Sequence, residues 1–180
     1  MVYKKFFIGG ARCGKSALAQ KFIENLGEKR LYIATCRVED HEMAKRVEKH
    51  KQMRGIGWDL VEEDVDPVKC ILAAKNYDGI LFDCVSLWVS NLLCDGKNEK
   101  FIIDSANKFA NILNEISISI AIVSLEVGLG IVPENALSRK YRDILGMVNQ
   151  ILASSCIDAY FVTSGLPILL KGQPLENTLC

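Results

Sequence analysis

Short runs of consecutive apolar residues alternate along the chain with longer segments in which apolar residues recur every three or four positions. The runs are rich in β-branched and large apolar side chains and contain no regular polar alternation, which is typical of strands covered on both faces. They occupy residues 3–8, 31–34, 80–82, 118–124 and 160–163.

The segments between these runs have the apolar spacing of amphipathic helices. The repeating positions are Leu18, Phe22 and Leu26 after the first run, Phe109, Leu113 and Ile116 before the fourth, and Leu137, Tyr141, Leu145, Val148 and Leu152 before the fifth. Alternation of strands and helices predicts an α/β fold with a mostly parallel sheet and helices on both sides. Because no repeat, low-complexity tract or linker divides the chain, we expect one domain over residues 1–180.

Composition narrows the function classes. The 180 residues are 49% hydrophobic and carry 22 Lys+Arg against 22 Asp+Glu, so there is no basic excess to hold nucleic acid. No apolar stretch approaches the roughly 20 residues that span a bilayer, and the first residues lack a signal-peptide pattern. Seven scattered cysteines without a Cys-x-x-Cys pair, and only two histidines, argue against a disulfide framework or a zinc centre. We therefore expect a cytoplasmic protein.

A complete phosphate-binding motif follows the first predicted strand and precedes a predicted helix. Residues 9–16 read GGARCGKS and match G-x-x-x-x-G-K-[ST], the P-loop pattern. The glycines allow backbone N–H groups to surround phosphate oxygens at a helix N-terminus. Lys15 is expected to reach the β- and γ-phosphates, and Ser16 to bind Mg²⁺.

A P-loop also needs an acidic residue at the end of a nearby buried strand to organise Mg²⁺. Asp83 closes the apolar run 79–82 and fits that position. The alternative is an aspartate that only caps the following helix.

Other P-loop classes fit less well. No Asn-Lys-x-Asp motif is present to read guanine, and the one Asp-x-x-Gly, residues 143–146, lies inside a helical pattern. The chain is also too short for the coupling elements of a nucleic-acid motor. A small-molecule kinase or a nucleotidyl transferase remains.

A basic helical segment covers residues 40–54. Arg46, His50 and Arg54 repeat every four positions, and such like charges are tolerable if an anion binds there. Neighbouring cations disfavour the imidazolium form of His50, and a neutral imidazole is the form that can attack phosphorus. The alternative is a half-buried histidine on a solvated basic face. His41 is interpreted as a surface or capping residue.

A shaped loop follows the fourth predicted strand, where residues 124–133 contain two glycines and a proline. It is expected at the carboxyl edge of the sheet, where substrates bind in open α/β folds. The two tryptophans, Trp58 and Trp88, are interpreted as packing residues.

These stretches together resemble the bifunctional adenosylcobinamide kinase / adenosylcobinamide-phosphate guanylyltransferase family of cobalamin biosynthesis. The matching pieces span almost the whole chain in order: GGARCGKS (9–16), YIAT (32–35), EMAKRVEKHKQMR (42–54), LFDCVSLWVSNLL (81–93), EVGLGIVPEN (126–135), RKYRDILGMVNQ (139–150) and SGLPILLK (164–171). The P-loop is shared by many protein families, whereas the helix around His50 and the EVGLGIVP loop are sequence patterns found in far fewer of them.

The resemblance implies a RecA-like P-loop NTPase fold with three α/β/α layers, and two reactions at one nucleotide site. A nucleoside triphosphate (ATP or GTP) phosphorylates adenosylcobinamide. GTP then transfers GMP to His50 and on to the phosphorylated corrinoid, giving adenosylcobinamide-GDP. Mg²⁺ on Ser16 and Asp83 and a homotrimer are implied as well. The nucleotide contacts carried over are Gly9, Gly10, Ala11, Arg12, Cys13, Gly14, Lys15, Ser16, Ile33, Ala34, Thr35, Lys51, Gln52, Met53, Arg54, Glu62 and Asp83.

Two positions depart from the family pattern. Cys13 stands where the family usually has serine, and Leu125 where an asparagine normally precedes Glu-Val-Gly. Two other functions remain open from the residues: a P-loop kinase of another small alcohol in which His50 only binds phosphate, and a nucleotide-dependent binding module.

Overall fold

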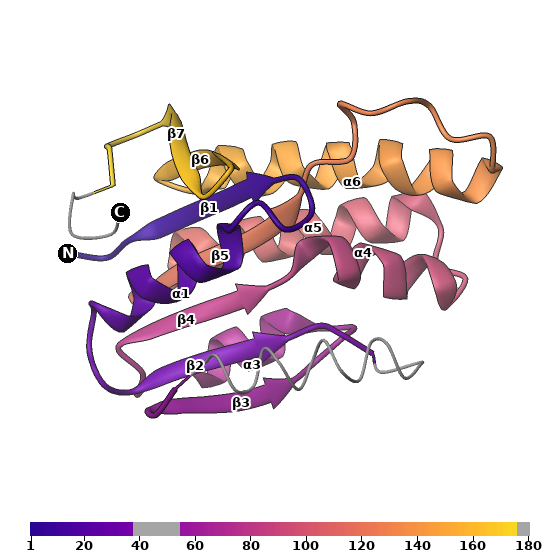
Figure 1. Ribbon diagram of the computed structural model, residues 1–180. Helices are drawn as coiled ribbons and strands as arrows, with labels where there is room; N and C mark the ends of the chain where they lie inside the picture. Colours follow the sequence, from indigo (N-terminus) through magenta and orange to yellow (C-terminus); the bar gives the residue numbers. More distant parts are fainter. Residues whose placement is uncertain (38–54, 176–180) are drawn as a thin grey trace.

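Within the part of the chain that the structure describes, seven strands form one sheet in the order β3-β2-β4-β5-β1-β6-β7 (Figure 1). The computed structural model describes residues 1–37 and 55–175. Neighbouring strands pair in parallel except β7, which runs antiparallel to β6. The strands are β1 (Lys4–Gly9), β2 (Arg30–Ala34), β3 (Trp58–Glu62), β4 (Gly79–Asp83), β5 (Ser119–Leu125), β6 (Asp158–Thr163) and β7 (Leu166–Lys171).

Helices cover both faces of this sheet. Helix α1 lies on one face, and α3, α4, α5 and α6 lie on the other (Figure 1). The predicted mostly parallel α/β/α sandwich is therefore confirmed. The helices are α1 (Lys15–Glu24), α3 (Pro67–Ala73), α4 (Val85–Cys94), α5 (Glu99–Glu115) and α6 (Ala136–Ser155).

The hydrophobic core consists of two clusters separated by the sheet. Successive strand residues point to opposite faces, so Phe6 belongs to the cluster under α3–α6 and Phe7 to the cluster under α1. Both clusters are buried, which explains why the central strands read as continuous apolar runs. In the larger cluster the rings of Phe82, Trp88 and Phe109 meet edge to face at 5.2–6.4 Å between centroids. Trp88 is thus a packing residue, as predicted.

Two strands were missed by the apolar pattern, and both lie at edges of the sheet. Strand β3, with the sequence WDLVE, exposes Asp59, Leu60 and Glu62. Strand β7, LPILLK, is exposed along most of its length. Polar residues interrupt the apolar pattern of β3, whereas β7 is apolar but contains Pro167, which a central strand does not tolerate. The half-buried Trp58 packs on the ring of Tyr32 at the β3 edge.

Helix α1 and the buried face of α6 are also shorter than the apolar spacing in the sequence predicted. Helix α1 ends at Glu24, before Leu26. In α6 the buried stripe begins after Leu137, which is 57% exposed. Asn98 and Asn135 fix where α5 and α6 begin, because each side chain accepts a hydrogen bond from the backbone N–H three residues later.

Parallel strands bring their carboxyl ends to one edge of the sheet. The loops that follow β1, β2, β4 and β5 leave this edge, so the P-loop, Asp83 and the loop at residues 126–135 emerge there. No helix in residues 1–37 and 55–175 is long and apolar enough to cross a membrane. The six cysteines of the described ranges are free thiols.

Candidate nucleotide-binding site

The P-loop connects β1 to α1 in the strand–loop–helix arrangement that the motif requires. Gly14 is the N-cap of α1 with a φ of 97°, a left-handed conformation that favours glycine. Lys15, the first residue of the helix, is only 8% exposed, and its Nζ donates to the carbonyl of Gly10 at 3.0 Å. The ammonium group is therefore held inside the curve of the loop. Ser16 follows it and is partly exposed.

The turn between β6 and β7 supports the P-loop from the side. The N–H of Gly165 donates to the carbonyl of Cys13 at 2.8 Å. A Cβ on Gly14 would lie 3.1 Å from the Cα of Gly165, and a Cβ on Gly9 would lie 2.2 Å from the carbonyl oxygen of Val162. Glycine is thus favoured at both positions by close packing.

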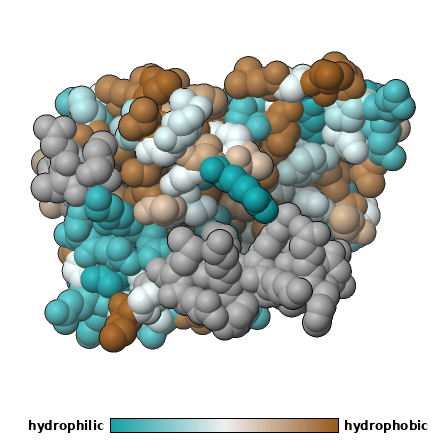
Figure 2. Space-filling model, in the orientation of Figure 1, coloured by the Kyte–Doolittle hydropathy of each residue, from teal (hydrophilic) through white to brown (hydrophobic). Residues whose placement is uncertain are grey.

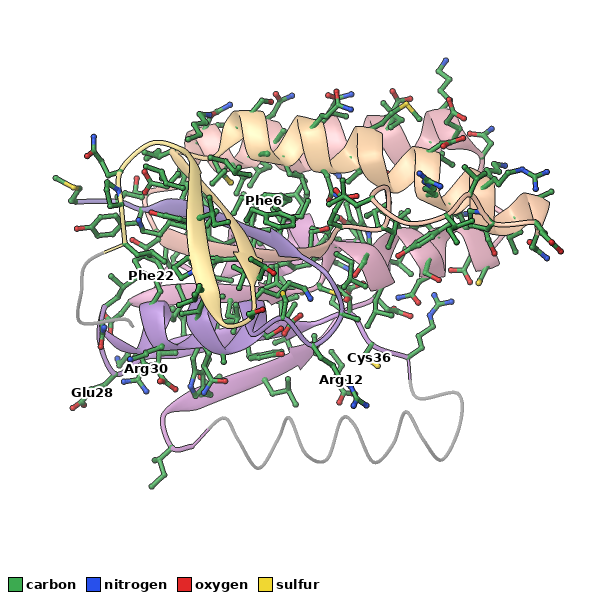
Figure 3. All side chains as sticks on the ribbon, turned by 45° about the horizontal axis from the view of Figure 1, so that its top comes forward. Phe6, Arg12, Phe22, Glu28, Arg30 and Cys36 are labelled. Atoms are coloured by element: carbon green, nitrogen blue, oxygen red, sulfur yellow. The ribbon has the colours of Figure 1, made fainter. Side chains whose placement is uncertain are left out.

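A cleft of about 420 Å³ opens beside the P-loop. Its walls come from three carboxyl-edge segments: the P-loop residues Gly10 to Cys13, the residues Glu126 and Leu129 after β5, and the end of β6. Figure 3 shows Arg12 and Cys36 at this end of the molecule, with Glu28 at the opposite end. The cleft lies where an open α/β sheet binds its ligand.

Asp83 ends β4 and is oriented by its neighbour on β2. The hydroxyl of Tyr32 donates to Asp83 Oδ2 at 2.8 Å. The N-cap of α4 is Cys84, and it makes no side-chain capping hydrogen bond. Asp83 is therefore not the capping residue of α4. The adjacent thiol is an inert part of the core, because burial raises the pKa of Cys84 to about 11.

The residues expected at the end of β2 differ in accessibility. Ile33 and Thr35 are fully buried, and Ala34 is partly exposed. The Thr35 hydroxyl accepts from the N–H of Cys84 and donates to its carbonyl, both at 2.8 Å. The side chain of Thr35 thus joins the ends of β2 and β4. A nucleotide contact from this segment stays a prediction.

Glu62 lies at the same edge but on the far side of the sheet. It ends β3, which is separated from β1 by β2, β4 and β5. Four strand spacings of about 4.8 Å place it roughly 19 Å from the P-loop strand. Asp83, two spacings away, is much closer. The structure therefore brings Asp83, and not Glu62, near the P-loop.

The basic segment lies outside the described residues, which end at Arg37 and resume at Gly55. His50, Lys51, Gln52, Met53, Arg54, Arg46 and His41 all fall there, and their expected roles stay predictions. Arg37 bonds to two aspartates. Its guanidinium donates to both carboxylate oxygens of Asp95, at 2.7 and 2.8 Å, and also to Asp64.

A protein-family model matches most of the chain. The model described as "Cobinamide kinase / cobinamide phosphate guanyltransferase" (CobU) matches residues 5–170. This chain belongs to the CobU family. The resemblance drawn from the motifs is thus confirmed, and the family is one of transferases.

Curated relatives of this CobU-family chain have similar length. It is 37% identical over 175 residues to the bifunctional adenosylcobalamin biosynthesis protein CobP of Pseudomonas aeruginosa. The aligned part covers 96% of this chain and 99% of the relative. This chain is 39% identical over 177 residues to CobU of Salmonella typhimurium, covering 91% and 97%.

The fold is also found among solved structures. A Pyrococcus horikoshii protein, 10% identical in sequence, superposes with a TM-score of 0.53 and covers 98% of this chain and 89% of its own. In this CobU-family chain β5 lies between the P-loop strand β1 and the Asp83 strand β4. The fold is the predicted mostly parallel α/β fold with the P-loop between its first strand and helix.

Sequence reasoning missed two residues that shape the CobU-family site. Tyr32 orients Asp83, and Gly165 supports the P-loop. Neither has a local sequence signal, because each acts on a residue 51 or more positions away through strand pairing.

Proposed function

We propose that this protein phosphorylates the hydroxyl group of adenosylcobinamide and then attaches GMP to that phosphate, giving adenosylcobinamide-GDP in cobalamin biosynthesis. The observation that carries this proposal is the CobU family match over residues 5–170. The proposal is also supported by the position of the P-loop and of Asp83, the last residue of β4, at the same edge of the sheet. One domain, residues 1–180, performs both steps, since every described strand joins a single sheet.

In both steps the P-loop, Gly9 to Ser16, holds the nucleotide phosphates through its N–H groups and the N-terminus of α1. Lys15 is bonded to Gly10 in the described conformation, and it turns toward the β- and γ-phosphates of ATP or GTP when they bind. The further nucleotide contacts are Ile33, Ala34, Thr35, Lys51, Gln52, Met53, Arg54, Glu62 and Asp83.

The residues around Ser16 and Asp83 fit Mg²⁺. A hydroxyl and a carboxylate are the hard oxygen ligands that Mg²⁺ prefers. The Tyr32 hydroxyl holds Asp83 Oδ2, which fixes the carboxylate at the strand end. When bound, Mg²⁺ neutralises charge on the phosphates of the nucleotide.

His50 carries the nucleotidyl transfer. Its neutral imidazole nitrogen attacks the α-phosphorus of GTP, forming an N–P bond while the bond from the α-phosphorus to the bridging oxygen of pyrophosphate breaks. A phosphate oxygen of the phosphorylated corrinoid then attacks the same phosphorus and displaces the histidine. Arg46, Lys51 and Arg54 stabilise the negative charge that develops on the transferring group.

The protein acts in the cytoplasm as a homo-oligomer, a trimer by its resemblance to the family. Apolar side chains left exposed on the β7 edge support association: Leu166, Ile168, Leu169 and Leu170 are 40–64% exposed. Figure 2 shows apolar surface gathered over the β6–β7 hairpin and over the loop after β5.

Intact-protein mass spectrometry tests the proposal. The protein is incubated with GTP and Mg²⁺ and kept out of acid, because a phosphoramidate is acid-labile. A GMP-sized adduct is expected on the wild type and absent from His50→Ala. His41→Ala, which removes the chain's other histidine, is the matched control and keeps the adduct. A folded, GTP-binding wild type without an adduct contradicts guanylyl transfer and leaves a P-loop kinase or a binding module.

A further inference from the structure

The carboxylate of Glu126 lies beside the P-loop. Neither the family resemblance nor the P-loop motif gives this carboxylate a role. Glu126 directly follows β5, the strand between the P-loop strand and the Asp83 strand. In the strand register Leu125 pairs with Gly9 and Val123 pairs with Asp83. Glu126 therefore leaves the sheet between the P-loop and Asp83.

Three contacts fix this carboxylate relative to the P-loop. The N–H of Glu126 donates to the carbonyl of Gly9 at 3.0 Å, which ties its backbone to the first P-loop residue. Its Oε1 accepts from the N–H of Gly128. A Cβ on Gly128 would lie 2.8 Å from that oxygen, so a side chain there would push the Glu126 carboxylate out of this position. Arg142 on α6 holds the turn from outside by donating to the Gly128 carbonyl at 2.5 Å.

The side chain of Glu126 lines the cleft of about 420 Å³ together with Gly10, Ala11, Arg12 and Cys13. No ion pair in residues 1–37 and 55–175 neutralises it, since the salt bridges found there join Lys5 to Asp158 and Arg37 to Asp64 and Asp95. An unneutralised carboxylate beside a triphosphate site opposes phosphate binding by charge repulsion. A proton-accepting role accounts for a carboxylate at this place.

The other carboxylates at this edge are less suited to that role. Asp83 is bonded to Tyr32 and is the expected metal ligand. Glu62 lies four strands away from β1. Glu126, directly after the strand adjacent to β1, is the described carboxylate that lines the cleft beside the P-loop.

We propose that Glu126 is the general base of the kinase step, a role that rests on the proposed function. The acceptor hydroxyl oxygen of adenosylcobinamide attacks the γ-phosphorus, and its proton passes to the Glu126 carboxylate. The bond between the γ-phosphorus and the β–γ bridging oxygen breaks, and its electron pair leaves with the nucleoside diphosphate beside Lys15.

The two activities differ in their need for this base. An alcohol must lose a proton when it becomes a phosphate ester. The nucleophiles of guanylyl transfer are a neutral imidazole and a phosphate monoester oxygen that is already ionised, so neither needs Glu126. Loss of the base therefore separates the kinase from the guanylyltransferase.

Glu126→Gln provides the test, because the amide keeps an oxygen acceptor for the Gly128 N–H and removes the basicity. With ATP, Mg²⁺ and adenosylcobinamide, its kinase rate is expected to fall about 10²–10⁴-fold. The GMP adduct from GTP is expected at the wild-type rate. Synthetic adenosylcobinamide phosphate should then yield adenosylcobinamide-GDP normally. Glu134→Gln, an exposed glutamate of the same loop, is the matched control and keeps both activities.

Three results overturn this role. One is a wild-type kinase rate in Glu126→Gln. The second is parallel loss of phosphorylation and of the GMP adduct in a folded protein, which would make Glu126 a nucleotide or metal ligand. The third is a wild type that forms the GMP adduct but has no kinase activity, which leaves guanylyl transfer intact. A wild type that forms no adduct instead contradicts the proposed function itself.

Discussion

A buried ion pair at the end of the sheet opposite the P-loop gives a quantitative test of the structure. Lys5 on β1 and Asp158 on β6 are 5% and 3% exposed, and their Nζ and Oδ2 atoms are 2.6 Å apart. Lys5 also donates to the Tyr160 hydroxyl at 3.0 Å, and that hydroxyl donates to the carbonyl of Gln173 at 2.6 Å. The N–H of Gln173 donates to Asp158 Oδ1 at 2.8 Å, which closes a ring of hydrogen bonds.

Asp158→Asn removes the negative charge and leaves the buried Lys5 ammonium without its counter-ion. Burial alone would lower the pKa of Lys5, but its bonds to Asp158 and Tyr160 outweigh burial and raise it. Breaking a buried pair in this way costs roughly 3–5 kcal/mol of unfolding free energy. For a chain of this size, that lowers Tm by about 10 °C.

The assay is thermal and denaturant unfolding followed by circular dichroism at one protein concentration, because association changes apparent stability. Asp104→Asn, an exposed aspartate on α5, is the control and should be neutral within about 0.5 kcal/mol. Lys5→Met/Asp158→Asn should be more stable than Asp158→Asn alone, because no buried cation is left unpaired. The GMP adduct at 20 °C should be unchanged, since the pair is remote from the P-loop. The reasoning is refuted if Asp158→Asn costs under about 1 kcal/mol, or if the double variant is the less stable of the two.

Two further predictions concern the P-loop and the buried thiols. Gly14→Ala should weaken GTP binding at least tenfold by calorimetry, because a left-handed φ costs an L-residue about 1–2 kcal/mol and the new Cβ would press on Gly165. Gly146→Ala, in α6 with open space around it, should bind normally. Burial raises the pKa of Cys84 to about 11 and of Cys156 to about 12, so iodoacetamide at pH 8 should modify the exposed Cys94 and spare both. Because both pKa values are raised by folding, the protonated thiols contribute their full stabilisation below about pH 9, and this stabilisation is lost as the pH rises toward 11 and 12. Rapid modification of Cys84 in the native protein at pH 8 would contradict the burial argument.

The sequence by itself determined the elements whose physical requirement is local. Residues 9–16 specify a phosphate loop because the glycines, Lys15 and Ser16 act within one turn of chain. Central strands such as β1 and β5 were visible because both of their faces are buried, which forces a continuous apolar run. Asp83 could be placed at a strand end for the same reason, and the order of the motifs identified the family.

Only the tertiary structure decided which distant residues meet. Edge strand β3 carries no continuous apolar run, and edge strand β7 is apolar but contains Pro167, so neither has the pattern of a strand buried on both faces. Strand order places β5 between β1 and β4, and this neighbourhood sets Glu126 beside Gly9 while leaving Glu62 four strands away. Tyr32 reaches Asp83, and Gly165 reaches Cys13, across 51 and 152 positions of chain. Such contacts depend on strand pairing and hydrogen bonding between segments far apart in the sequence, which local residue patterns do not encode.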